Sequence, residues 1–353
     1  MPYTYESCER IRFEDPATGV RIIQLTSFPV IHWLGGCSGQ GIAADGKTIL
    51  LFADRTFVRN APRDLYRVES DGSHLALLAR EPHGAVVSAD RRWVYAGRQN
   101  SLIRIPLDGG DEEELARLDG YTHIHVSADS PDGRHVFGQG GHEDGTFDVM
   151  RLDLGDGSVA RLLRASYLMP VELCGKAEER LLASVAPIDE AGASRIPWGY
   201  WSFTYGGDDF AAVPFVRSTN HYVPLRRTGE VATTAHHPGN AIDVAAPGDA
   251  ASRVLAHGSC FWHITADATG EWIVADTNWP DVGLQLVHAA SGRFRTLCAT
   301  GASGGHPQWT HAHPCLSPAA DYVLYTSDRT GIQQVYLAEI PETLKAALRD
   351  QVQ

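Results

Sequence analysis

The stretch HITADATGEWIVADTN at residues 263–278 decides the fold, because its pattern recurs along the chain. It joins an apolar strand to a second apolar strand through a turn rich in Asp, Gly and Ala. Similar stretches are GIAADGKTILLFADRT (residues 41–56), VVSADRRWVYAGRQN (86–100), HVSADSPDGRHVFGQGG (125–141) and HPCLSPAADYVLYTSDRT (313–330). Further strand-like sequence follows each copy. Such internal repetition indicates an all-β repeat architecture.

The spacing of these copies predicts a β-propeller. They begin roughly every 40 to 50 residues, which is typical of four-stranded blades. Two less regular segments, residues 168–215 and 219–256, fill the remaining gap and bring the total to seven units. We therefore predict one seven-bladed β-propeller domain over residues 1–353. A two-sheet sandwich is the structural alternative, but it gives no reason for one unit to recur so often.

The two ends of the chain predict how the ring closes. The strand-like stretch GVRIIQLT (residues 19–26) has no partner in its own unit, and the last unit, ending in QQVYLAEIP (333–341), is one strand short. A strand near residues 20–26 is therefore predicted to complete the last blade, which removes two exposed sheet edges. The helical pattern at about residues 341–351 has Pro341 in its first turn and is expected to be a surface appendage.

Composition and charge exclude several classes of protein. The 353 residues are 43% hydrophobic and carry a formal net charge of −13, which disfavours a binder of nucleic acid or of anionic membranes. We expect no signal peptide, because the first residues contain no apolar stretch after a basic segment, and no membrane span, because no run of 18 apolar residues occurs. The six cysteines are scattered without a C-x-x-C pair, so we expect reduced, mostly buried thiols in a cytoplasmic protein. The sequence carries no signal of the oligomeric state.

An unusual concentration of metal-binding side chains occurs in GGHPQWTHAHPCLSP, residues 304–318. Residues i and i+2 of a strand point to the same face, so His311 and His313 are expected to project together into the central channel. Gln308 lies where the chain enters this strand, and its amide oxygen could be a further ligand.

A histidine of the preceding blade occupies the equivalent position. The same number of residues separates His313 from Asp328 and His263 from Asn278, so both histidines are expected at the channel. His221 falls near the equivalent position one blade earlier. Three successive blades therefore present a histidine at the same mouth.

The kind of ligand limits the metal. Three neutral imidazoles and an amide suit Mn, Fe, Ni or Zn better than Ca or Mg, and leave a strong Lewis acid with positions open to an anionic group. A single histidine at the start of a blade is commonly structural. A structural role does not explain the combined set of His263, Gln308, His311 and His313, because independent structural needs seldom align across blades. Trp262 adjoins one ligand, but alternation along the strand is expected to turn it toward the blade core.

Other polar residues are candidates to bind substrate. His123 and His125 have the i, i+2 spacing but no second cluster in register, so a structural role is as good an interpretation. Arg217, Arg226 and Arg227 flank His221 and are candidates to bind a substrate carboxylate, with Arg217 predicted also as a catalytic residue. The alternative for each arginine is a solvated side chain at a blade edge.

Residues 306–341, together with residues 15–26, resemble the oligogalacturonate lyases, a polysaccharide lyase family of seven-bladed propellers. The resemblance implies an enzyme that splits short oligogalacturonates by β-elimination with a manganese ion held by three histidines and a glutamine. The matching positions are His263, Gln308, His311 and His313. The family's base, a histidine one blade earlier, would map to His221. Residues 165–215 match no pattern of this family.

The chemistry of elimination explains these residue types. The proton on C5 of a uronate is poorly acidic while the adjacent carboxylate is charged, and a divalent metal on that carboxylate offsets the charge. A histidine base with a pKa near 7 then suffices, and His221 is expected to fill that role. The predicted cofactor is Mn²⁺, with another divalent transition metal open, and the predicted partner is a small anionic oligosaccharide. The alternatives are a related lyase for another uronate-containing saccharide and a non-catalytic binding propeller.

Overall fold

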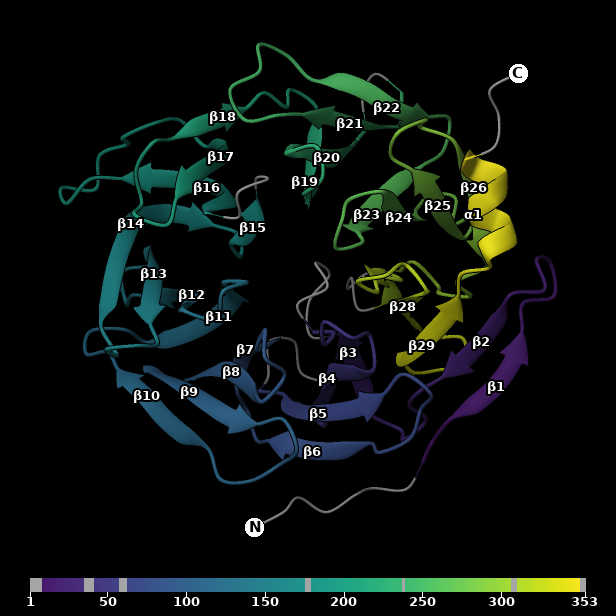
Figure 1. Cartoon of the computed structure of the whole chain (residues 1–353), viewed down its shortest axis with the longest axis horizontal. Coiled ribbons are helices and arrows are strands. Elements are labelled where there is room, and N and C mark those ends of the chain that lie inside the picture. Colours follow the sequence, from purple (N-terminus) through teal and green to yellow (C-terminus); the bar gives the residue numbers. More distant parts are fainter. Residues whose placement is uncertain are drawn as a thin grey trace.

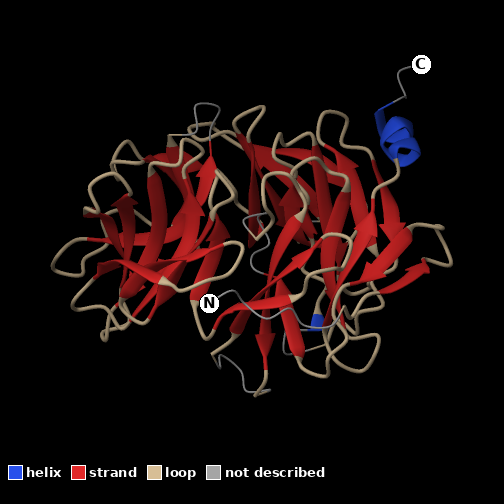
Figure 2. Cartoon of the chain, turned by 60° about the horizontal axis from the view of Figure 1, so that its bottom comes forward, coloured by secondary structure: helices blue, strands red, loops and turns tan. Residues whose placement is uncertain are grey.

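The computed structural model describes residues 8–34, 41–56, 62–174, 179–236, 239–305 and 310–349, without the side chains of residues 219–220. In this part of the chain, strands form seven antiparallel blades around a central axis (Figure 1). Strands make up nearly all of the regular structure in the tilted view of Figure 2, and the one prominent helix lies near the C-terminus. The prediction of an all-β, seven-bladed propeller is confirmed.

The blades are numbered along the chain by their innermost strands. Blade 1 contains β3 (Ile31–Leu34), β4 (Thr48–Asp54), β5 (Asp64–Glu69) and β6 (Ala76–Ala79). Blade 2 contains β7 (His83–Val87), β8 (Trp93–Arg98), β9 (Ser101–Pro106) and β10 (Glu113–Arg117). Blade 3 contains β11 (His123–Asp129), β12 (His135–Gly141), β13 (Phe147–Asp153) and β14 (Val159–Leu168).

The second half of the ring continues in the same way. Blade 4 contains β15 (Glu172–Cys174), β16 (Arg180–Ile188), β17 (Gly199–Thr204) and β18 (Ala211–Val213). Blade 5 contains β19 (Ser218–Leu225), β20 (Glu230–Ala235), β21 (Ala241–Ala245) and β22 (Arg253–His257). Blade 6 contains β23 (Phe261–Ala266), β24 (Trp272–Thr277), β25 (Leu284–His288) and β26 (Phe294–Cys298). Blade 7 contains β27 (Cys315–Leu316), β28 (Tyr322–Ser327), β29 (Gln334–Glu339), β2 (Arg21–Gln24) and β1 (Ile11–Glu14).

The second strand of each repeat is apolar because its blade packs on both faces. All residues of β4 and β24 are buried, as expected for strands covered on two sides. Neighbouring blades share their cores: Val274 and Leu286 of blade 6 lie in one cluster with Val323 of blade 7. Burial between blades therefore holds the ring together.

The recurring Asp-Gly sequence forms the turn between the first two strands of a blade. In blade 1, Asp45 Oδ1 accepts a hydrogen bond from the Lys47 backbone N–H at 3.0 Å, and Gly46 has a φ of 69°. In blade 3, Asp132 accepts the backbone N–H of Arg134 at 3.0 Å. Asp side chains favour such turns, and glycine allows the left-handed conformation. The repeat thus marks the same hairpin in successive blades.

The N-terminal strand closes the ring. β2 pairs antiparallel with β29, Ile22 opposite Ala338 and Gln24 opposite Tyr336. In Figure 1 the first strands lie beside the last ones. This confirms the predicted closure. β1 then pairs with β2 and gives blade 7 a fifth strand that the sequence pattern had not indicated.

Blades 3 and 4 are linked through one long strand. β14 pairs with β13 of blade 3 through its first part and with β16 of blade 4 through its last residues, where β15 continues along β16. The two blades therefore form one eight-stranded sheet. This sharing explains why residues 168–215 do not follow the regular repeat.

The innermost strands define two mouths of the channel. We call the end where these strands begin the entry mouth, and the end where they finish the exit mouth. A cavity of about 400 Å³ lies at the exit mouth, lined by strand-end residues that include Val87, Asp129, Pro224, Ala266 and Leu316. The candidate histidines occur at the starts of their strands, so they belong to the entry mouth.

The C-terminal helix α1 (Glu342–Arg349) packs against blade 6. Leu348 joins a buried cluster with Trp272, and the Arg349 guanidinium lies 4.9 Å from the centre of a Trp272 ring. The helix thus lies at the rim of the ring (Figure 1) and buries part of its surface against blade 6. No helix in the described part of the chain has the length and apolarity to span a membrane.

Candidate metal centre

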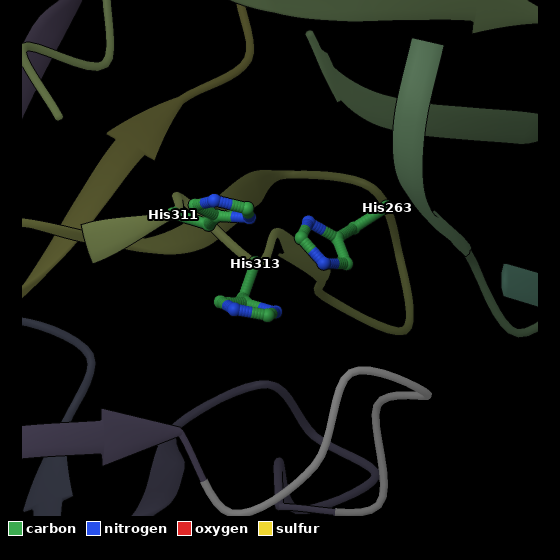
Figure 3. Close-up of side chains that lie close together, drawn as sticks. All are labelled: His263, His311 and His313. Carbon is green, nitrogen blue, oxygen red and sulfur yellow. The ribbon is translucent and has the colours of Figure 1, made fainter. Parts of the chain in front are cut away.

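Three imidazoles converge at the entry mouth (Figure 3). They belong to His263 on β23 and to His311 and His313 just before β27, and one ligand atom of each lies within 4.8 Å of the others. The ring centres of His263 and His313 are 3.8 Å apart, and those of His263 and His311 are 5.5 Å apart. The geometry therefore brings together three of the four predicted metal ligands.

Asp276 on β24 orients His263. Its Oδ2 accepts a hydrogen bond from His263 Nδ1 at 2.7 Å, and its Oδ1 accepts one from the His263 backbone N–H at 2.6 Å. The proton is thereby held on Nδ1, which leaves the lone pair on Nε2. His263 Nε2 is buried and has no hydrogen-bond partner among the residues that the structure describes. Burial, and then the nearby His311, lower the pKa of His263 to about 3, so this ring is neutral at pH 7.

His311 and His313 were expected to lie on a regular strand, but the structure places them before it. β27 begins only at Cys315, and His313 has a φ of 44°, in the left-handed region. The backbone N–H of His313 donates to Asp276 Oδ2 at 3.1 Å. The chain therefore turns before the strand, and the two rings, 5.9 Å apart, converge through the turn rather than through strand alternation.

The residues present fit a divalent transition metal. An unpartnered, buried imidazole nitrogen facing two further imidazoles is the ligand chemistry of such ions, and a carboxylate behind a ligating histidine is the usual support. Gln308, the fourth predicted ligand, lies outside the described residues.

His221 on β19 lies beside this group. Its ring centre is 4.4 Å from that of His263, and its Nδ1 is 3.1 Å from the backbone oxygen of Trp262. A carbonyl oxygen only accepts hydrogen bonds, so Nδ1 carries the proton and Nε2 carries the lone pair. Burial, and then His263, lower the pKa of His221 to about 3. His221 is therefore a neutral imidazole next to the candidate ligands, and its pKa lies below the value near 7 that was expected of the base.

An exposed tryptophan borders the same site. Trp279 is 67% exposed, and its ring lies 6.0 Å from His311 and 5.0 Å from Trp262. Trp262 itself packs 5.7 Å from the His221 ring, which corrects the expectation that it points into the blade core. The register of β23 and β24 shifts between residues 261 and 264, and such a bulge redirects side chains.

His123 and His125 form a second imidazole cluster at the entry mouth, in blade 3. The His123 ring lies 6.2 Å from His83 of blade 2. In the described ranges of the chain, His125 Nδ1 is buried without a hydrogen-bond partner, and burial lowers the pKa of His125 to about 4. This cluster joins blades 2 and 3, and its role in substrate binding stays a prediction.

In the part of the chain that the structure describes, the predicted arginines have contacts away from the candidate metal ligands. Arg217 forms two hydrogen bonds of 2.9 Å with the buried carboxylate of Asp243. Arg226 lines the cavity at the exit mouth together with Asp129. The backbone N–H of Arg227 bonds to Thr269 at a turn between blades. Their assignment to a substrate carboxylate stays a prediction.

Sequence reasoning missed three residues of the entry mouth: Asp276, Trp279 and Arg63. Asp276 could have been found by counting the hairpin register, which places it across from His263. Trp279 and Arg63 lie in connections between strands, where sequence spacing does not predict position.

Comparison with solved structures gives full-length matches at low identity. Two of them are oligogalacturonate lyases. One, from Vibrio parahaemolyticus, has a TM-score of 0.78 and 16% identity, and the match covers 98% of this chain and 100% of that chain. The other is in complex with manganese and has a TM-score of 0.77 and 17% identity, with 98% of both chains covered. A puromycin hydrolase matches with a TM-score of 0.54 and 14% identity, over 92% of this chain and 61% of that chain.

Sequence comparison adds no assignment, since no family model and no curated protein matches the chain. The structural likeness therefore shows the fold. It supports the propeller architecture that the repeat pattern predicted.

Proposed function

We propose that this protein is a metal-dependent lyase that cleaves short oligogalacturonates by β-elimination. The observation that carries the proposal is the convergence of His263, His311 and His313 at the entry mouth, with His221 at 4.4 Å from the His263 ring. The likeness to oligogalacturonate lyases, one of them in complex with manganese, supports the same reaction class and the choice of Mn²⁺ as the metal.

The three ligand histidines would hold the metal through neutral imidazole nitrogens. Asp276 keeps the His263 ring in the required tautomer, and its bond to the backbone of His313 ties blades 6 and 7 together. The bound metal would supply a Lewis acid that offsets the charge of a uronate carboxylate.

His221 would remove the C5 proton. Its hydrogen bond to the Trp262 backbone oxygen places the lone pair on Nε2, the atom that must accept a proton. Because His221 neighbours the ligands without belonging to their group, it can reach a substrate whose carboxylate the metal holds. Trp279 offers an exposed indole face on which a pyranose ring can stack.

The test is an assay of purified, manganese-loaded protein with digalacturonate and trigalacturonate. Elimination creates a C4–C5 double bond conjugated to the carboxylate, which is followed by ultraviolet absorbance. We expect turnover that a chelator abolishes and added Mn²⁺ restores. Product from another uronate oligosaccharide alone would correct the substrate, and a chelator-insensitive protein without product would overturn the proposal.

A further inference from the structure

Among the described residues, no carboxylate forms an ion pair with the Arg63 guanidinium at the entry mouth, although Asp54 acts on its charge from a longer distance. Arg63 is the last residue of the connection between β4 and β5. Asp54, at the end of β4, pairs with Ile31 of β3, and Asp64, at the start of β5, pairs with Ala53 of β4. Since Ile31 begins the innermost strand β3, this connection lies at the mouth that holds the metal-binding histidines. Arg63 thus approaches the site from blade 1.

The surroundings of Arg63 leave its charge poorly compensated. No ion pair joins it to a carboxylate in the part of the chain that the structure describes, and its Nε is buried without a hydrogen-bond partner. Burial lowers the pKa of Arg63, and Asp54 opposes this effect. Burying a cation that has an N–H group without an acceptor is energetically unfavourable unless an anion pairs with the cation.

Trp33 connects Arg63 to the candidate metal centre. The Arg63 guanidinium carbon lies 4.5 Å from the centre of the Trp33 ring, and that ring lies 6.3 Å from His313. Stacking on an aromatic face fixes the plane of a guanidinium and leaves its edge available for two parallel hydrogen bonds to a carboxylate. Arg63 is therefore two side-chain contacts from a metal ligand.

We propose that Arg63, held on Trp33, forms a second carboxylate-binding subsite next to the metal, and that this subsite makes the protein select substrates with carboxylates on adjacent sugars. The inference rests on the proposed function and deepens it. One carboxylate is bound at the metal, and the carboxylate of the neighbouring uronate is bound by Arg63. Chains whose neighbouring sugar lacks a free carboxylate are then poor substrates.

The test compares trigalacturonate with the same trimer methyl-esterified on the residue that flanks the scissile one, in the parent and in Arg63→Gln. Esterification should raise KM of the parent about 10-fold or more, as expected for loss of a charge-assisted bidentate pair. Arg63→Gln should show the higher KM with the free acid and no further rise with the ester. Equal ester penalties in the two proteins would overturn the inference while leaving the lyase assignment in place.

Arg55→Gln is the matched control. Arg55 lies in the same connection but is paired with Asp64 and Tyr66, so its removal changes the net charge equally without touching the subsite. This variant should keep the full ester penalty. Arg63→Lys keeps the positive charge but lacks the planar guanidinium, so it should retain part of the affinity that Arg63→Gln loses. It replaces Arg63→Gln in the test if that variant does not fold.

Equilibrium binding separates the two proposals. Digalacturonate is titrated into manganese-loaded protein by calorimetry, a measurement that does not require turnover. Binding without cleavage, weakened in Arg63→Gln, would overturn the lyase assignment and support the subsite. Absence of both binding and cleavage in the parent would overturn both.

Discussion

Asp276 binds His263 twice, through the backbone N–H at 2.6 Å and through Nδ1 at 2.7 Å. The carboxylate is 1% exposed, and burial raises its pKa. Burial of the Asp276 carboxylate is unfavourable unless hydrogen bonds compensate it. These bonds fix the His263 ring with its lone pair directed at the other two imidazoles. This pair is the structural basis of the candidate metal centre.

Asp276→Asn should lower Mn²⁺ affinity about 10- to 100-fold, because loss of a supporting carboxylate usually has that effect. Affinity is measured by calorimetric titration of metal-free protein. Asp267→Asn, at the turn on the other end of the same hairpin, is the control and should leave metal affinity unchanged. Parental affinity in Asp276→Asn would contradict the supporting role.

His311→Ala should lower metal affinity about 10-fold or more, and the same holds for His263→Ala and His313→Ala. Metal content after dialysis is determined by elemental analysis. The exposed histidine of blade 5, replaced in His257→Ala, is the control and should retain the parental content. If His311→Ala retains as much metal as the parent, the ligand set is wrong.

His221→Ala should fold and keep its metal but lose about 10²- to 10⁴-fold in turnover, the usual contribution of a general base. Turnover is followed by ultraviolet absorbance, and metal content is measured on the same sample. Near-parental turnover would transfer the base to another residue, with His123 or His125 next. Loss of metal would make His221 a ligand instead.

Trp279→Ala should raise KM for a trimeric substrate about 3- to 10-fold with little change in kcat, because an exposed ring contributes to binding rather than to the core. Trp279→Phe keeps a stacking face and should recover most of the affinity. An unchanged KM in the alanine variant would remove Trp279 from the substrate site.

Acid should destabilise the metal-free protein partly through His32. This residue is 4% exposed, and burial lowers its pKa from 6.5 to about 4. The unfolded chain binds the proton at higher pH than the folded one, so stability falls as the pH falls from about 6.5 to about 4, by on the order of 3 kcal/mol. Urea unfolding at several pH values should show a flatter pH dependence in His32→Gln, whereas the exposed control His74→Asn should follow the parent.

The sequence alone predicted the architecture because the information is local and repeated. Each hairpin carries its own turn residues and its own apolar strand, so seven units and the closing strand near residues 20–26 could be counted without a structure. The candidate ligands His263 and His313 were predicted by the same counting, since equivalent positions in adjacent blades meet at one mouth.

Tertiary structure decided what the repeat does not encode. The bulge in β23 sets the direction of Trp262, and the turn before β27 brings His311 and His313 together in a way that strand alternation did not predict. Arg217 and Arg63 are the same residue type but have different surroundings. Asp243 forms an ion pair with Arg217, whereas Arg63 is stacked on Trp33, which lies beside a candidate ligand. Those differences arise from contacts between strands and blades that lie far apart in the chain, where neither spacing nor residue type specifies which side chains will meet.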